Sequence, residues 1–154
     1  MSNSPAQFDR VFLRPQHAIF YRRARRMRWQ TSARAEYTTL ILLSGQAAFE
    51  TSGSVDEVHM GDALLLDPGL AAKATGQHAA EYLQLSLSPS YVLDCAVRTR
   101  LMGAGNTVTF RASRVSDDER LSRLARDLAD ELTQAEPGQE VVVAALVEQM
   151  VVHL

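Results

Sequence analysis

The chain contains the stretch Gly61-Asp62-Ala63-Leu64-Leu65-Leu66-Asp67-Pro68-Gly69, in which a short apolar run lies between a Gly-Asp pair and a Pro-Gly pair. A run of this length, bounded by residues that favour turns, predicts a short strand at Ala63–Asp67. Similar segments, rich in β-branched or aromatic residues, occur at Val11–Arg14, His17–Arg22, Tyr37–Ser44, Ala47–Thr51, Asp56–Met60, Glu81–Leu87 and Thr107–Arg111. Turn residues such as Ser44-Gly45 and Ser52-Gly53-Ser54 separate many of them, and this cadence predicts a β-sandwich or barrel.

From Ser116 onward the spacing of the apolar residues changes to that of helices. Ser116, with Glu119 three residues later, has the pattern of a capping box. Leucines then follow at intervals of three and four, at Leu121, Leu124, Leu128 and Leu132, as on one face of a helix. Pro137-Gly138 interrupts the pattern, and a second helix is expected from about Gln139. A short connection of this kind favours an antiparallel helical hairpin.

Composition and charge exclude several classes of protein. The 154 residues fit one domain, and a net charge of −2 gives the chain as a whole no electrostatic preference for nucleic acid. Cys95 is the single cysteine, which excludes an internal disulfide and a multi-cysteine metal site. The sequence has no apolar run long enough to span a bilayer, and its first residues lack the pattern of a signal peptide. We therefore expect a cytoplasmic protein with no membrane partner.

Two parts of the sequence resemble the cupin-type sensor domain of AraC-family transcription regulators. Tyr37–Gly45 and the Gly61–Gly69 stretch match that family, in which a Gly-Asp turn, an apolar strand and a Pro-Gly turn follow one another. The segment Ala144–Val152 is similar to the family's dimerisation helix. The resemblance implies a fold that is mainly β with C-terminal helices, a cupin-like jelly-roll β-barrel followed by an antiparallel two-helix hairpin.

The resemblance also implies a division of the chain and a function. Residues 1–16 would form an N-terminal arm that folds over the pocket, residues 17–112 an effector-binding barrel, and residues 113–154 a helical hairpin for dimerisation. The barrel would bind a small polar or anionic effector, and a homodimer would transmit binding to paired helix-turn-helix units. These DNA-binding units are absent here and are expected after residue 154. The alternative is a free-standing, metal-independent cupin, either a small-molecule binder or an isomerase.

The histidines do not have the spacing of a metal-dependent cupin enzyme. Such enzymes resemble one another in carrying two histidines one residue apart, then a carboxylate, and another histidine after the Pro-Gly turn. Here the matching segment before Gly45 holds no histidine, and Lys73 stands near the position of the last ligand. A protonated lysine has no lone pair to donate to a metal. The four histidines, His17, His59, His78 and His153, show no paired spacing. We expect no metal, no other cofactor, no catalytic residues and no enzymatic activity.

The strand Glu81–Leu87 supplies candidate ligand contacts. Its leucines alternate with Tyr82, Gln84 and Ser86, so the two sets of side chains face opposite sides of the sheet. If the helical hairpin covers the leucines, Tyr82 and Gln84 point into the barrel, where the resemblance places the effector. The alternative is that they form a solvated face.

Further candidates precede the strand that begins at Tyr37. Arg28 and Gln30 lie near the position of a polar ligand contact in the family, and Trp29 between them could stack on a ring or only cap the barrel. The basic run Arg22–Arg28 is either a solvated edge or an anion site, since guanidinium groups suit carboxylates and phosphates. Tyr37 completes the expected ligand-binding set, with a place in the core as its alternative.

The second helix predicts self-association. Apolar residues at three- and four-residue spacings form its main stripe, at Val143, Leu146, Val147, Met150 and Val151. Other valines lie off this stripe, so a monomer would leave apolar surface in water. We expect a two-fold dimer through the stripe, in which Leu146→Glu or Met150→Glu gives a folded monomer. The alternative is that the helix packs only on its own barrel.

Overall fold

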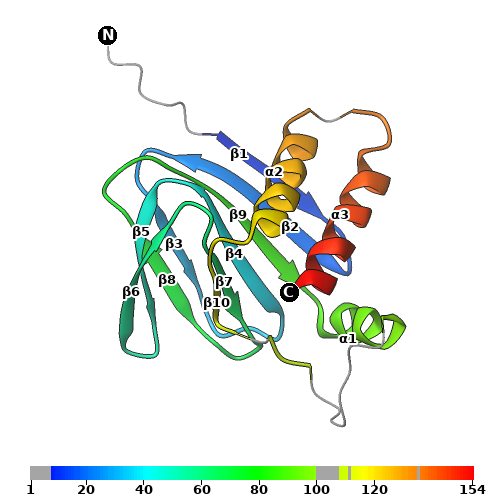
Figure 1. Ribbon diagram of the computed structural model, residues 1–154, viewed down its shortest axis with the longest axis horizontal. Helices are drawn as coiled ribbons and strands as arrows, with labels where there is room; N and C mark the ends of the chain where they lie inside the picture. The colour runs from blue at the N-terminus through cyan, green and yellow to red at the C-terminus, as the bar shows by residue number, and fades with distance from the viewer. Residues whose placement is uncertain (1–7, 100–107, 111, 135) are drawn as a thin grey trace.

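A computed structural model describes residues 8–99, 108–110, 112–134 and 136–154 (Figure 1). Two β-sheets lie face to face, and two helices cover the outer face of the larger sheet. The strands are β1 (Phe8–Leu13), β2 (His17–Ala24), β3 (Arg28–Thr31), β4 (Tyr37–Ser44), β5 (Gln46–Thr51), β6 (Ser54–His59), β7 (Ala63–Leu66), β8 (Ala72–Thr75), β9 (Ala80–Leu87) and β10 (Arg114–Val115). The helices are α1 (Pro89–Arg98), α2 (Glu119–Gln134) and α3 (Gln139–His153).

The order of the strands is that of a jelly roll. The larger sheet has the order β1-β2-β9-β4-β7-β10 and the smaller sheet the order β3-β8-β5-β6. All neighbouring strands are antiparallel. Strands β2 to β9 alone give two four-stranded sheets between which the chain crosses repeatedly, the arrangement found in cupins. The expected fold class, a cupin-like barrel followed by two helices, is confirmed.

The larger sheet is buried on both faces, and this produces two separate cores. Its inner face contributes residues such as Leu40, Leu42 and Tyr82 to a core between the two sheets. Its outer face contributes Leu83 and Leu85 to a second core, which they share with α2 and α3. In β9 the leucines therefore lie beneath the helices and Tyr82 faces the smaller sheet, as the alternation of Glu81–Leu87 predicted.

The first turn of α2 differs from its prediction. Asp118 Oδ1 accepts a hydrogen bond from the backbone N–H of Leu121 at 3.0 Å, and the helix begins at Glu119. Asp118 is therefore the capping residue, and the capping box predicted from Ser116 is wrong. Ser116 Oγ instead accepts a hydrogen bond from Arg114 Nε at 3.3 Å.

Helix α1 lies in a part of the chain for which only strands and turns were predicted. Ser88 Oγ accepts a hydrogen bond from the backbone N–H of Tyr91 at 3.2 Å, and Pro89 is the first helical residue. A serine cap followed by proline is a common helix start. The strand predicted at Thr107–Arg111 is also wrong in its described part, since residues 108–110 are not in a strand; its two end residues lie outside the described ranges.

Both aspartates of the Gly61–Gly69 stretch hold the segment that returns from α1. Asp62 Oδ2 accepts hydrogen bonds from the backbone N–H of His59 at 2.9 Å and from Arg114 Nη2 at 2.7 Å. Asp67 Oδ1 accepts one from the backbone N–H of Phe110 at 3.0 Å. Burial raises the pKa of Asp62, but these hydrogen bonds and the Arg114 charge outweigh it, so the net pKa is lowered. The stretch thus forms β7 and also anchors a distant segment.

Gly45→Ala is expected to be strongly destabilising. Gly45 has φ of +89°, and a Cβ there would lie 2.6 Å from the carbonyl oxygen of Ala79. The left-handed conformation costs a non-glycine residue about 1–2 kcal/mol, and the overlap with backbone adds to this. Gly53 has φ of +82°, but nothing lies within 4 Å of the position that a Cβ would take, so Gly53→Ala is the matched control. In urea denaturation Gly45→Ala should lose clearly more stability than Gly53→Ala, and equal losses would contradict the overlap.

Candidate ligand-binding site

A pocket of about 220 Å³ opens between the two sheets, at the side formed by β1, β2, β3 and β9. Aromatic side chains lie next to charged and polar ones in its wall. The wall includes the side chains of Asp9, Phe20, Arg22, Trp29, Tyr82 and Gln84. Tyr82 and Gln84, which the sequence predicted to face the barrel interior, therefore line one pocket together.

The strand register explains why the charged residues meet. Asp9 is the partner of Arg22 across β1 and β2, and Arg22 is the partner of Tyr82 across β2 and β9. Because cross-strand partners lie on the same face of a sheet, the three side chains form one row. Arg22 Nε and Nη2 donate hydrogen bonds to Asp9 Oδ1 and Oδ2 at 2.7 and 3.2 Å. Asp9 and, to a smaller extent, the Tyr82 hydroxyl raise the pKa of this guanidinium.

A second row contains Phe20 and its cross-strand partner Gln84. Trp29 reaches this row from the smaller sheet, and its indole N–H donates a hydrogen bond to Gln84 Oε1 at 2.7 Å. Gln84 Nε2 in turn donates to Ser86 Oγ at 3.1 Å. The Gln84 amide is thus held at both ends, with aromatic rings beside it.

The charges of the pocket follow from these contacts. The hydrogen bond from Arg22 lowers the pKa of Asp9. Burial raises the pKa of Tyr82, although the hydrogen bond from Arg22 acts in the opposite direction. At neutral pH the pocket therefore presents a carboxylate, a guanidinium and a neutral phenol beside an amide. Such a set can hydrogen-bond a polar or anionic group while the aromatic side chains contact a ring or an apolar face.

Three of the predicted ligand contacts lie elsewhere. Arg28 and Gln30 are exposed on the outer face of β3, while Trp29 and Thr31, which alternate with them, are buried. The prediction that Arg28 and Gln30 face the barrel interior is therefore wrong. The positions of β3 that do face inward are one residue away, at Trp29 and Thr31. Tyr37 lies on the helical side of the larger sheet, and its hydroxyl donates a hydrogen bond to the carbonyl oxygen of Val108.

Asp9 and Phe20 were not singled out in the sequence. The alternation of β2 places Phe20 and Arg22 on one face, a signal that could have identified them as a pair. That this face lies beside Tyr82 depends on the pairing of β2 with β9, two strands that are far apart in the chain. No local pattern contains this information.

Most of the stripe predicted as a dimer interface lies inside the protein. Val143, Val147 and Met150 are 0% exposed and belong to the core between α2, α3 and the larger sheet. Side chains without accessible surface cannot contact a second chain, so the interface predicted through these three residues is corrected. Leu146 and Val151 are partly buried against the same core.

The residues that face the barrel interior do not fit a metal site. The core between the sheets consists mainly of aliphatic and aromatic side chains. His17 packs against the rings of Phe12 and Tyr91, whereas His59 lies beside Glu57 and His153 beside Asp118. Within the described ranges, no three His, Cys, Asp or Glu side chains come together so as to hold a metal ion.

We expect the purified protein to contain no stoichiometric transition metal, because the described residues form no cluster of ligand side chains that could compete for one. Elemental analysis of protein purified without chelators measures this directly. A stoichiometric amount of zinc, iron or manganese that survives dialysis would contradict the prediction.

Comparison with known proteins relates the chain to others by fold. No family model and no curated protein matches the sequence. A cupin superfamily protein from Desulfitobacterium hafniense is 13% identical, with a TM-score of 0.48, and the match covers 57% of this chain and 83% of that one. A cupin 2 conserved barrel domain protein from Salinispora arenicola is 17% identical, with a TM-score of 0.48 and coverage of 60% and 84%.

An enzyme is also among the similar structures. A variant of the oxalate decarboxylase of B. subtilis is 17% identical, with a TM-score of 0.41, and the match covers 47% of this chain and 21% of that one. Identities this low concern the barrel fold alone, and no activity is transferred from them. No helix in the described part of the chain is long and apolar enough to cross a membrane.

Proposed function

We propose that this chain is the effector-sensing and dimerisation domain of an AraC-type transcription regulator. It binds a small polar or anionic molecule in the pocket between the sheets and transmits binding to a helix-turn-helix domain outside the present chain. The observation that supports this most is the position of Tyr82 and Gln84 beside Arg22 in one partly enclosed pocket. Two further features favour sensing over catalysis. The Gly61–Gly69 stretch resembles that family, and the core between the sheets is mainly apolar.

In this proposal the pocket residues have separate roles. Arg22 binds the anionic or polar group of the ligand. This group either replaces the Asp9 carboxylate as the partner of Arg22 or binds to Arg22 together with it. Gln84 and the Tyr82 hydroxyl supply hydrogen bonds that fix the orientation of the ligand. Trp29 and Phe20 contact its less polar face.

The opposite face of the same strands offers a route to the helices. Arg23 and Glu81, the neighbours of Arg22 and Tyr82, are cross-strand partners on the outer face, and Arg23 Nε donates to Glu81 Oε2 at 3.1 Å. Glu81 Oε1 also accepts a hydrogen bond from Arg126 of α2. A shift of β2 and β9 on ligand binding would therefore be transmitted to α2 through the Glu81 carboxylate.

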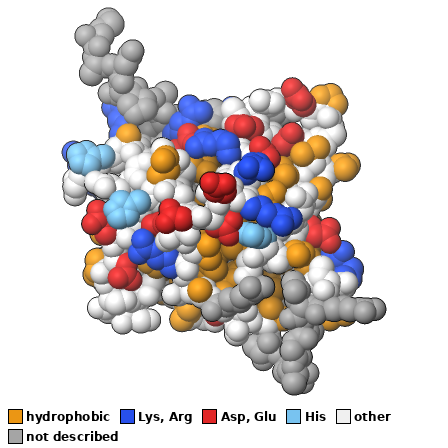
Figure 2. All heavy atoms as spheres, viewed as in Figure 1, with side chains coloured by type: hydrophobic (Ala, Val, Ile, Leu, Met, Phe, Trp, Pro, Cys, Tyr) orange, Lys and Arg blue, Asp and Glu red, His pale blue; other side chains and the backbone are white. Residues whose placement is uncertain are grey.

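The proposed dimer uses the outer face of α3. Val141 is 75% exposed and Val142 40% exposed, while Ala144 and Ala145 are exposed on the same helix. Figure 2 shows hydrophobic side chains at the edge of the molecule where α3 begins in Figure 1. Small and apolar residues permit close approach of a symmetry-related helix, and an exposed apolar face of this kind marks an interface.

Tyr82→Phe and Gln84→Ala are expected to weaken ligand binding about ten- to a hundred-fold, because a hydrogen bond to a charged group contributes roughly 1.5–3 kcal/mol. A panel of sugar acids, amino acids and small carboxylic acids is first screened by thermal shift, and the best compound is then measured by calorimetry. Arg28→Ala and Gln30→Ala, on the outer face of β3, are matched controls and should bind like the wild type. Wild-type affinity in both pocket variants would contradict the site.

A free-standing, metal-independent cupin, either a binder or an isomerase, is the second candidate. The same pocket favours it, since the described part of its wall comes from β1, β2, β3 and β9 of the barrel itself. The gene beyond the codon for Leu154 distinguishes the two. Two helix-turn-helix patterns in a continuing reading frame support the regulator, and a stop codon supports the free-standing protein.

A further inference from the structure

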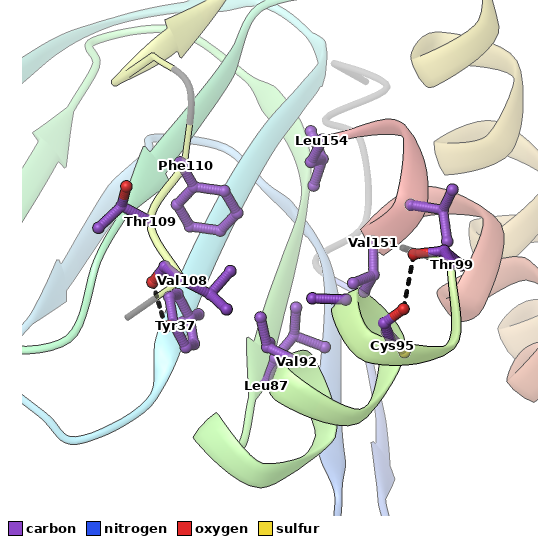
Figure 3. A pocket seen from close by; sticks show the side chains of 12 residues that line it. Tyr37, Leu87, Val92, Cys95, Thr99, Val108, Thr109, Phe110, Val151 and Leu154 are labelled. Atoms are coloured by element: carbon purple, nitrogen blue, oxygen red, sulfur yellow. Dashed lines mark hydrogen bonds between the residues drawn. The ribbon is translucent and has the colours of Figure 1, made fainter. Parts of the chain in front are cut away.

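A second cavity, of about 150 Å³, lies outside the barrel, between the larger sheet and the helices α1 and α3 (Figure 3). Figure 3 shows Tyr37, Val108 and Phe110 on one side of it, and Val151 and Leu154 of the C-terminal end on the other. Leu87 of β9 and residues of α1 complete the wall. The larger sheet separates this cavity from the pocket of Tyr82 and Gln84, which lies on the opposite face.

The hydrogen-bonding groups in this wall are mostly engaged within the protein. The Tyr37 hydroxyl donates to the carbonyl oxygen of Val108, and the Thr99 hydroxyl donates to the carbonyl oxygen of Cys95 at 2.6 Å. Burial raises the pKa of the Cys95 thiol, which is therefore neutral. Within the described part of the chain, no charged side chain lines the cavity. The surface that remains for a ligand is thus mainly aliphatic and aromatic.

The cavity has a wall that is fixed from several sides. Phe110 contacts the Tyr37 ring edge-on, with ring centroids 5.6 Å apart, and its backbone N–H is held by Asp67. Helix α1 is tied to α3 by Arg98, which donates to Glu148 Oε1 at 2.6 Å. These contacts hold the wall in place, and a mainly apolar space of about 150 Å³ is large enough for a molecule such as benzene.

We propose that this cavity is a binding site for a small uncharged apolar molecule, about the size of one aromatic ring. The size of the cavity, its apolar wall and its internally satisfied hydroxyl groups define this class of ligand. The site is distinct from the polar pocket between the sheets. Because Val151 and Leu154 belong to its wall, the bound molecule strengthens the contact of the end of α3 with α1 and the sheet.

Toluene is a suitable probe, and methyl ¹H–¹³C spectra of the whole chain report where it binds. The expected result is saturable shifts at Leu87, Val92 and Val151, with unchanged signals at Leu40 and Leu42 in the core between the sheets. Toluene should also raise the midpoint of thermal unfolding. The Tyr82→Phe variant should respond like the wild type, since its pocket lies on the other face of the sheet.

Ala96→Leu places extra carbon atoms in the cavity, because Ala96 lies in its wall. This variant should keep the fold and lose both responses to toluene. Ala48→Leu, an equal change at an exposed position of β5 in the smaller sheet, is the matched control and should keep them. If Ala96→Leu does not fold, Val152→Phe fills the same space from its half-buried edge. Absence of saturable shifts in the wild type, or unchanged shifts in the folded filled variant, would overturn the proposal.

Discussion

Met150→Glu is expected to unfold the helical layer rather than to produce a folded monomer. Met150 is 0% exposed and packs in the core shared by α2, α3 and the larger sheet. The change removes about 1.5–3 kcal/mol of apolar burial and places a carboxylate in a buried hydrophobic core, which costs several kcal/mol more. Together these effects approach the whole stability of a typical domain, about 5–15 kcal/mol. Circular dichroism and thermal unfolding measure the loss.

Ala145→Glu is the matched control, because it introduces the same charge on the exposed face of α3. Its circular dichroism should equal that of the wild type. If α3 forms the proposed dimer, light scattering after size exclusion should give a dimer for the wild type and a monomer for Ala145→Glu. A wild-type monomer at micromolar concentration would contradict the dimer, and a Met150→Glu variant of normal stability would contradict the burial argument.

Glu81→Ala should have the second large effect, because this carboxylate joins three elements. Glu81 Oε2 accepts hydrogen bonds from the Tyr21 hydroxyl at 2.8 Å and from Arg23 Nε at 3.1 Å, and Oε1 accepts one from Arg126 of α2. Arg126 Nη2 also donates to the carbonyl oxygen of Leu43 at 3.3 Å. Breaking a buried ion pair costs about 3–5 kcal/mol, and the exposure of both arginines reduces this to roughly 2–3 kcal/mol.

The same carboxylate gives the stability a predictable dependence on pH. Burial raises the pKa of Glu81, but the hydrogen bonds from Tyr21 and Arg126 and the arginine charges outweigh it, so the net pKa is lowered. A lowered pKa in the folded state stabilises the protein above the unfolded value, about 4.3 for glutamate, and the contribution is lost as the pH falls through the folded pKa. Urea denaturation of the wild type and of Glu81→Gln should therefore differ most near pH 7 and converge in acid. A difference that does not change with pH would contradict the role of the charge.

Much of the fold was predictable where local patterns are strong. The predicted bounds of Tyr37–Ser44 coincide with those of β4, and the leucines of α2 are buried as their spacing indicates. The strands β3 and β8 have four residues each, too few for a periodic pattern to be recognised. Helix α1 carried a usable signal in Ser88-Pro89, although its content of valine and tyrosine resembles that of the neighbouring strands.

The candidate site was predictable only within single strands. The alternation of β9 correctly divides Tyr82 and Gln84 from the leucines. Asp9 and Arg22 join them because β2 pairs with both β1 and β9, which is a property of the topology. The assignment of Arg28 and Gln30 failed because a position near the family's ligand contact does not show which face of β3 points inward. Similarly, the spacing along α3 showed an apolar face correctly but could not show whether its own chain or a second one covers it.

The burial of β4 on both faces has a consequence for how the sequence can diverge. Seven of its eight residues are buried, whereas five of the six residues of β6 are exposed. In a saturation mutagenesis library, β4 should therefore accept few replacements beyond other aliphatic residues, and β6 should accept most polar ones. Related chains that bind different molecules would then share the composition of this central strand, and the differences between them would accumulate at exposed positions and at the pocket positions of β1, β2, β3 and β9.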